Sequence, residues 1–444
     1  MLATAGCART SAPPLALLYQ DIGPKAGQPP LIVIPGAFGS QLRHRTTGQE
    51  IWPESDTSLM FSNYDNIEVA IDAETLEPIT SDVDAFDIFR DGLGQDFYGR
   101  LLKTLEKIGG YRRMYPGQTP EADGRYFYVY PYDWRLDNVR SVQGLHDLIE
   151  QLAVDHGKPD LQVDILGHSN GGLLGRYYAR FGTADMLRDG AVRPDWNGSH
   201  RIRRLLMVGT PNLGTMQPVL SYVRGEEIGL GSIAPDIVAT CPGTMQLMPH
   251  PDIPWLYNLR GEPIGLNIYE PDTWRELKWS IFSQTSQSRA VYRHGGGKQG
   301  QSYLATLEAY FGRHMARGRR FQEVLCLPAR PDEPEPYVFG GDCTPTVAHL
   351  VVESAGKSVR ANERPDTIRN PLPGIDYENL INEPGDGVVT RSSLMGRQRT
   401  RSGPLLPELN VAHSIFLCDE HLQLTGNPSF QDNLLYTLLS ARTD

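Results

Sequence analysis

The sequence lacks several features that would place the protein in a particular class. It has no window near the roughly 18 to 20 uninterrupted apolar residues that a membrane-spanning helix requires. It is also poor in positive charge, with 42 Lys and Arg against 53 Asp and Glu and a formal net charge of -11. Dense basic runs are missing apart from short patches such as residues 201–204. These absences exclude nucleic acid as a predicted partner and leave peripheral contact as the only membrane association that the sequence allows.

Cysteine is scarce, and the five cysteines do not stand at the short spacings of a zinc site. We therefore predict no metal. In an oxidising compartment Cys326 and Cys343 would close a short disulfide loop, and buried free thiols are the alternative. Residues 1–6 before Cys7 resemble the end of a trimmed lipoprotein signal, and a disordered start is the alternative. If the signal is real, the soluble protein is secreted or lipid-anchored through Cys7; otherwise it is cytoplasmic. The oligomeric state stays open.

What is present indicates a well-folded chain of 444 residues, with 40% apolar and 21% charged residues. This length accommodates one large α/β domain with an insertion. Between about residues 216 and 335 the pattern breaks into short pieces rich in Pro, Gly and aromatic residues, which indicates a cap or lid. We predict an N-terminal tail over residues 1–28, a core formed by residues 29–215 and 336–444, and a cap over residues 216–335.

Apolar runs and amphipathic stretches alternate along the predicted core. Residues 31–34 form an all-apolar run ended by Pro-Gly, which is typical of a central strand buried on both faces. Further strands are predicted at residues 126–130, 163–166, 205–209 and 337–339, and helices at residues 139–152, 173–178 and 430–439. Such alternation predicts a mostly parallel central sheet with helices on both faces.

Ser169 is the candidate nucleophile. It stands in Gly167-His168-Ser169-Asn170-Gly171, between a predicted strand and a predicted helix. Acyl-transfer enzymes expose a serine on a strained strand-to-helix turn of this kind, where flanking glycines relieve crowding. The pattern predicts the α/β-hydrolase fold, and a plain Gly-Ser turn is the alternative.

Two backbone amides are expected to stabilise the oxyanion of the transition state. The Asn170 N–H is the first, and the Ala37 N–H in Gly36-Ala37-Phe38-Gly39, just after the first strand, is the second. Residues 294–297 have the sequence His-Gly-Gly-Gly, which resembles an oxyanion motif of some lipases. They lie after the serine in the chain, so we interpret them as a flexible cap loop.

The acid and the base should follow the nucleophile in the order acid, then histidine. Asp386 lies in the turn Gly385-Asp386-Gly387 before two β-branched residues, which favours the acid of a triad over a plain turn residue. His421 and His413 both follow it. We prefer His421, because it comes after the apolar run of residues 415–417 and before the last helix.

Together these segments resemble the lecithin:cholesterol acyltransferase and lysosomal phospholipase A2 family of α/β-hydrolases. The matching motifs are IPGAFGSQL at residues 34–42, PYDWRL at 131–136, GHS at 167–169, GTP at 209–211, DGVVTRS at 386–392 and HL at 421–422. The resemblance implies a triad of Ser169, Asp386 and His421, the Ala37 and Asn170 oxyanion donors, and an apolar or lipid-like ester as substrate. Asp133 and Arg135 are interpreted as a structural ion pair, with substrate contact as the alternative.

The sequence departs from the family pattern in one region. Animal members carry a cysteine pair in a membrane-contacting loop, whereas residues 43–120 contain no cysteine here. We further predict that Phe38, Trp52 and His168 contact the substrate, with core packing as the alternative for Trp52. The predicted chemistry is ester cleavage through an acyl-enzyme without a cofactor. Transfer of the acyl group to an alcohol, and a catalytically idle fold that binds a ligand, are the alternatives.

Overall fold

The computed structural model describes residues 14–23, 27–80, 82–188, 190, 197–328, 333–355, 358–406 and 409–440. The predicted lipid anchor at Cys7 lies outside these residues. None of the described helices combines the length and apolar character needed to span a bilayer.

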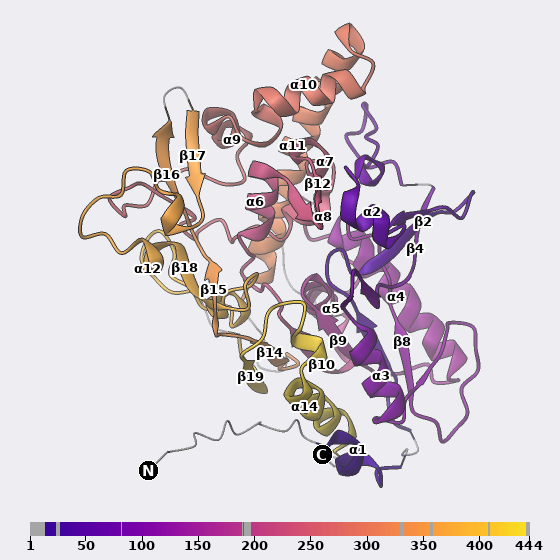
Figure 1. The fold of residues 1–444 in the computed structure, drawn as a ribbon. Helices are drawn as coiled ribbons and strands as arrows, with labels where there is room; N and C mark the ends of the chain where they lie inside the picture. Colours follow the sequence, from indigo (N-terminus) through magenta and orange to yellow (C-terminus); the bar gives the residue numbers. More distant parts are fainter. Residues whose placement is uncertain are drawn as a thin grey trace, which may run out of the picture.

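A parallel sheet forms the centre of the molecule (Figure 1). Its strand order is β19-β14-β10-β9-β1-β8-β7, and every neighbouring pair is parallel. The strands are β1 (Leu31–Ile34), β7 (Arg112–Arg113), β8 (Tyr126–Val129), β9 (Val163–His168), β10 (Ile202–Val208), β14 (Tyr337–Gly341) and β19 (His413–Leu417). The predicted mostly parallel sheet is confirmed.

Helices cover both faces of this sheet, as its apolar strands require. In β1 the side chains alternate: Leu31 and Val33 pack into one buried cluster, and Ile32 and Ile34 pack into the other. Residues of α1, α3 and α14 belong to the first cluster, and those of α4 and α5 to the second. These helices are α1 (Leu15–Tyr19), α3 (Gly99–Lys107), α4 (Asn138–Asp155), α5 (Asn170–Phe181) and α14 (Pro428–Leu439).

The first described helix, α1, lies within the segment predicted as a tail. Its Leu15 and Tyr19 are buried, and the Tyr19 hydroxyl donates a hydrogen bond to the Asp432 carboxylate at 2.7 Å. Five residues are too few for a periodicity signal in the sequence. The helix therefore exists through its packing against α14 rather than through local propensity.

Residues 40–96, after β1, form a small antiparallel sheet and short elements beside the main sheet. These are β2 (Ser40–His44), β3 (Glu50–Trp52), α2 (Asp56–Phe61), β4 (Val83–Ile88), β5 (Asp91–Gly92) and β6 (Gln95–Asp96). In this sheet β2 pairs with both β3 and β4. The segment brings Trp52 back to the loop that follows β1, as described below.

The predicted cap region consists mainly of helices that lie beyond one end of the main sheet (Figure 1). Its elements are α6 (Gln217–Arg224), β11 (Glu226–Ile228), β12 (Gly231–Ile233), α7 (Pro235–Val238), α8 (Pro242–Met245), β13 (Leu256–Tyr257), α9 (Pro271–Leu277), α10 (Gln284–Arg293) and α11 (Gly297–Leu325). A second small sheet joins this region to the later chain, because β13 pairs with β16 (Leu350–Ala355), which pairs with β17 (Ser358–Asn362). The remaining elements are β15 (Thr344–Val347), α12 (Tyr377–Ile381), β18 (Asn382–Gly385) and α13 (Arg391–Leu394).

The carboxylate of Glu68 connects the segment near α2 to the α10–α11 turn. It accepts hydrogen bonds from Arg293 Nη2 at 2.7 Å and from Tyr303 Oη at 2.7 Å, and it lies 3.0 Å from His294 Nε2. The His294 ring also stacks on Tyr303. His294, the first residue of the His-Gly-Gly-Gly segment, is thus part of a contact between the core and the cap.

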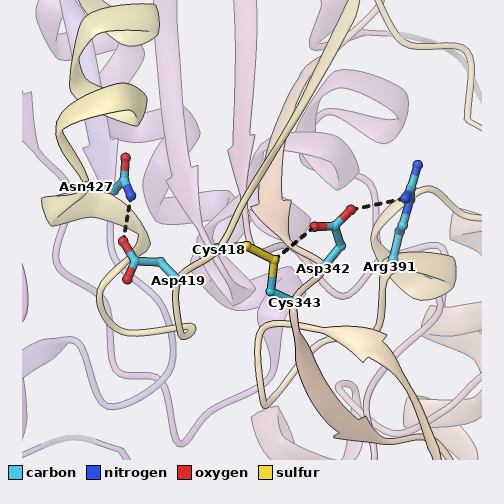
Figure 2. The surroundings of a disulfide bond; sticks show 6 residues. All are labelled: Asp342, Cys343, Arg391, Cys418, Asp419 and Asn427. Atoms are coloured by element: carbon cyan, nitrogen blue, oxygen red, sulfur yellow. Dashed lines mark hydrogen bonds and ion pairs between the residues drawn. A yellow bond between two sulfur atoms is a disulfide. The ribbon is translucent and has the colours of Figure 1, made fainter. Parts of the chain in front are cut away.

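The disulfide prediction for Cys326 and Cys343 is wrong. Cys343 is bonded to Cys418, with 5.0 Å between the two Cα atoms (Figure 2). Cys326 is a free cysteine after α11. Cys343 follows β14 and Cys418 follows β19. Because these strands are parallel neighbours, their carboxyl ends bring the two cysteines together.

Replacing Cys343 and Cys418 together with serine should lower the free energy of unfolding by about 2–5 kcal/mol, because the bond closes a long loop in the unfolded chain. Denaturant unfolding followed by circular dichroism measures this loss. The oxidised wild type should differ from the variant, and the reduced wild type should match it. Coincident curves for the oxidised wild type and the variant would contradict the expectation.

Candidate active site

Ser169 lies at the sharp turn between β9 and α5. Its backbone is strained, with φ 52° and ψ -122°. The turn needs its glycines: a Cβ on Gly171 would lie 2.4 Å from the Ile34 carbonyl oxygen, and one on Gly167 would lie 2.5 Å from the Gly171 backbone. The Ser169 N–H donates to the Val208 carbonyl at 2.7 Å, which ties the turn to β10. The predicted strand-turn-helix around Ser169 is therefore present.

The structure brings Asp386 and His421 together. Asp386 follows β18, and its Oδ2 lies 2.8 Å from Nδ1 of His421. The Val388 and Val389 amides donate to Asp386 Oδ1 at 3.0 and 2.7 Å, and both triad candidates are buried. Burial by itself would raise the pKa of the Asp386 carboxyl, but the charge and hydrogen bond of His421 and the two amides lower this pKa below its usual range.

Gly209, directly after β10, lies against this pair. It has a φ of +55°, and a Cβ there would lie 2.9 Å from His421 Cε1 and 3.2 Å from Asp386 Oδ2. A side chain at this position would displace the imidazole. The glycine of the Gly-Thr-Pro motif thus leaves room for the histidine and the carboxylate.

His413, the alternative base, lies elsewhere. It is the first residue of β19 and is exposed, whereas the carboxyl end of that strand is Leu417. The four residues from His413 to Leu417 span about 13 Å of extended chain. His413 therefore lies at the amino ends of the strands, whereas Asp386 lies near their carboxyl ends. The structure therefore separates His413 from Asp386.

A cavity of about 490 Å³ opens beside Ser169. Its lining includes Ser169, His421, Ala37, Phe38 and Trp52, together with apolar residues from the segment around α2 and from the cap. This volume lies in the usual range of small-molecule sites. His168 also belongs to the lining, so five of the residues predicted for catalysis or substrate contact meet Ser169 at this cavity.

The turn after β1 is held at several points. Gly39 N–H donates to the Gly36 carbonyl at 3.1 Å, and Phe38, with a φ of 61°, has a left-handed backbone. Trp52 Nε1 donates to the Phe38 carbonyl at 2.8 Å and its ring packs on Phe38 and Trp134. Trp52 is 3% exposed. It therefore supports the turn as a packed residue and also forms part of the cavity wall.

His168 is buried behind Ser169, and both of its ring nitrogens have partners in the protein. Nδ1 lies 2.7 Å from the Tyr98 hydroxyl, and Nε2 lies 3.2 Å from the His421 carbonyl oxygen. Burial lowers the pKa of His168 to about 3. These contacts occupy both ring nitrogens, while His168 also forms part of the cavity lining, and its contact with the substrate stays a prediction. Tyr98 has no motif around it in the sequence, and only the fold reveals its position.

Asn170 is the first residue of α5, where helix geometry leaves its N–H without an intrahelical acceptor. Its side chain is fixed by hydrogen bonds to the Tyr132 hydroxyl at 3.0 Å and to the Asn138 side chain at 2.8 and 3.0 Å.

Tyr132 belongs to the same segment as Asp133 and Arg135. The predicted ion pair of those two residues is confirmed, with Arg135 Nη2 2.7 Å from Asp133 Oδ2.

The sheet order and the strand-turn-helix at Ser169 define an α/β-hydrolase fold. A similar solved structure is that of the Tle4–Tli4 complex, with 14% identity, a TM-score of 0.58, and coverage of 94% of this chain and 98% of that chain. The Staphylococcus hyicus lipase matches at 12% identity and a TM-score of 0.37, covering 94% of this chain and 95% of its own. The Bacillus licheniformis lipase BlEst2 matches at 11% and 0.35, covering 94% of each.

The lecithin:cholesterol acyltransferase family model matches residues 97–249, which include the PYDWRL segment, Ser169 and the Gly-Thr-Pro motif. The predicted resemblance to this family is thereby confirmed. No curated protein matches the chain. The family match and the fold support an ester-acting enzyme of the hydrolase or acyltransferase type.

The lowered pKa of Asp386 predicts a pH dependence of stability. The folded state holds this proton less tightly than the unfolded chain, so the contribution is present above the unfolded pKa, near 4, and is lost as pH falls through the lower folded value. Asp386→Asn should remove part of the rise in unfolding free energy between about pH 3 and pH 5. Denaturant unfolding across this range measures it, and parallel curves for the two proteins would contradict it.

Proposed function

We propose that the protein is a serine hydrolase that cleaves apolar carboxylic esters through an acyl-enzyme. Ser169 is the nucleophile, His421 the general base and Asp386 the residue that orients it. The observation that carries the proposal is the Asp386–His421 hydrogen bond of 2.8 Å, with His421 lining the same cavity as a serine on a strained turn. Nucleophile, base and orienting acid are the minimal set for this chemistry.

The hydrogen bond to Asp386 uses Nδ1 of His421, so Nε2 is the nitrogen that can accept a proton from Ser169. In the first step Nε2 takes the proton of Ser169 Oγ while Oγ bonds to the ester carbonyl carbon. The negative charge on the carbonyl oxygen is stabilised by the N–H groups of Ala37 and Asn170. The imidazolium then gives its proton to the alcohol as the ester C–O bond breaks. Water repeats the sequence on the acyl-enzyme and releases the acid.

The cavity favours a neutral, apolar substrate. Phe38, Leu59, Phe97, Val238 and Leu247 are among its apolar lining residues. Of the described residues that line it, Glu226 and Glu227 are acidic and none is lysine or arginine. Burial also raises the pKa of the Glu226 carboxyl. An anionic group would meet no compensating cation in such a site.

Transfer of the acyl group to an alcohol is the second candidate, and the match to an acyltransferase family favours it. The two activities share the acyl-enzyme and differ only in the acceptor. The ratio of free acid to new ester, measured with an alcohol added to the assay, distinguishes them.

Ser169→Ala should abolish hydrolysis of p-nitrophenyl butyrate and labelling by a fluorophosphonate, because no nucleophile remains. His421→Ala should lower kcat by roughly 10⁴-fold or more, a loss typical of a triad member. Steady-state kinetics and gel fluorescence measure both effects.

His413→Ala is the matched control, since this exposed histidine lies away from the cavity, and its kcat should stay within about twofold of the wild type. Undiminished labelling of Ser169→Ala would refute the nucleophile. Equal losses in the two histidine variants would refute the base.

A series of p-nitrophenyl esters from acetate to decanoate tests the apolar cavity. Each buried CH₂ contributes up to about 0.8 kcal/mol, so kcat/KM should rise up to roughly fourfold per methylene until the cavity is filled. An ester of equal length whose acyl chain ends in a carboxylate should react more slowly than its neutral counterpart. A flat series, or no penalty for the carboxylate, would contradict the proposed substrate class.

A further inference from the structure

Tyr98, the residue before α3, is buried and forms part of the lining of the cavity beside Ser169. Its hydroxyl oxygen accepts a hydrogen bond from the Gly36 N–H at 2.9 Å and lies 2.7 Å from His168 Nδ1. A Cβ on Gly39 would lie 3.0 Å from the same oxygen. The hydroxyl is therefore enclosed between the turn after β1 and the residue before Ser169.

The partners fix the direction of each hydrogen bond. The His421 carbonyl oxygen can only accept, so His168 carries its proton on Nε2. Nδ1 of His168 is then the acceptor, and the Tyr98 O–H donates to it. One continuous line of hydrogen bonds results, from the Gly36 N–H to Tyr98, from Tyr98 to His168, and from His168 to the backbone of His421.

We propose that Tyr98 and His168 are positioning residues that hold the oxyanion turn and the base loop in a fixed relation on either side of Ser169. This inference rests on the proposed function. Gly36 precedes Ala37, the proposed oxyanion donor, and a Cβ on Gly36 would lie 2.8 Å from the Ser169 Cβ. His168 reaches the backbone of the base itself. The two loops come from opposite ends of the chain, and the line of hydrogen bonds connects them behind the nucleophile.

Such positioning matters because an oxyanion donor acts only when it is within hydrogen-bond distance of the developing charge. A displacement of about 1 Å can lower the rate by roughly 100-fold.

The neutral charge of His168 also affects the proposed base. The ring centroids of His168 and His421 are 4.8 Å apart, so a charged His168 would oppose the proton that His421 must accept. With its pKa lowered to about 3, His168 stays neutral throughout the range in which esterases work.

The test compares Tyr98→Phe with Tyr178→Phe in the protein of 444 residues. Tyr178 is the control, because it is also buried and its hydroxyl also contacts a histidine, His146 Nδ1 at 3.1 Å. Unlike Tyr98, it does not line the cavity. For Tyr98→Phe we expect kcat on p-nitrophenyl butyrate to fall by about 10- to 100-fold with KM within about twofold, and labelling of Ser169 to slow in parallel. Tyr178→Phe should retain the wild-type kcat, with a similar change in melting temperature. A kcat for Tyr98→Phe equal to that of the control, or a change in KM alone, would overturn the proposal.

His168 provides a second pair of variants, which decides the question if Tyr98→Phe does not fold. His168→Gln keeps an amide that can accept from Tyr98 and donate to the His421 carbonyl, whereas His168→Phe keeps the bulk and loses both hydrogen bonds. We expect the glutamine variant to recover at least about tenfold in kcat over the phenylalanine variant. Equal kcat values for the two would overturn the positioning role.

The wild type and Ser169→Ala complete the experiment. If the wild type shows no hydrolysis that depends on Ser169, the proposed function fails and the positioning role fails with it. If that hydrolysis is present and Tyr98→Phe matches Tyr178→Phe, only the positioning role fails.

Discussion

The close approach of α5 to the strands beneath it is the constraint on which the site depends. Gly171 has its backbone so near the Ile34 carbonyl that a single methyl group would collide with it. This contact helps the chain to pass sharply from β9 into α5 and to hold Ser169 at a positive φ of 52°. The rest of the fold holds the strained backbone of Ser169 in place, because β9 is paired on both sides and α5 is buried along its length.

The other candidate residues are arranged around that turn by the parallel sheet. Gly36, Gly209 and the disulfide all lie just after the carboxyl ends of strands. Because the strands are parallel, these ends lie on the same side of the sheet. Cys418 lies three positions before His421, and Gly341, beside Cys343, packs closely against Asp386. The covalent link therefore joins the segment behind Asp386 to the loop that carries His421. Hydrogen bonds through His168 and Tyr98 attach the same loop to the turn after β1.

Much of this arrangement could be predicted from the sequence because its signals are local. The apolar run of residues 31–34 and the strand-turn-helix at Ser169 each fit in a short window, and both appear in the structure. Asp386 and His421 followed from chain order and family resemblance. The sequence analysis does not find the Cys343–Cys418 bond, although each cysteine lies within two residues of the end of a strand and the two strands are neighbours. Tyr98 could not be found at all, since an isolated tyrosine acquires its role only from tertiary packing.

The cavity wall combines residues from the turn after β1, the turn at Ser169, the predicted cap region and the loop after β19, from Ala37 to Leu422. No short fragment of the chain contains enough of these segments to form it. Loss of turnover on heating or in denaturant would thus report local opening of either distant segment, because such opening removes part of the cavity wall before the central sheet unfolds. Turnover and global unfolding should therefore have separate midpoints.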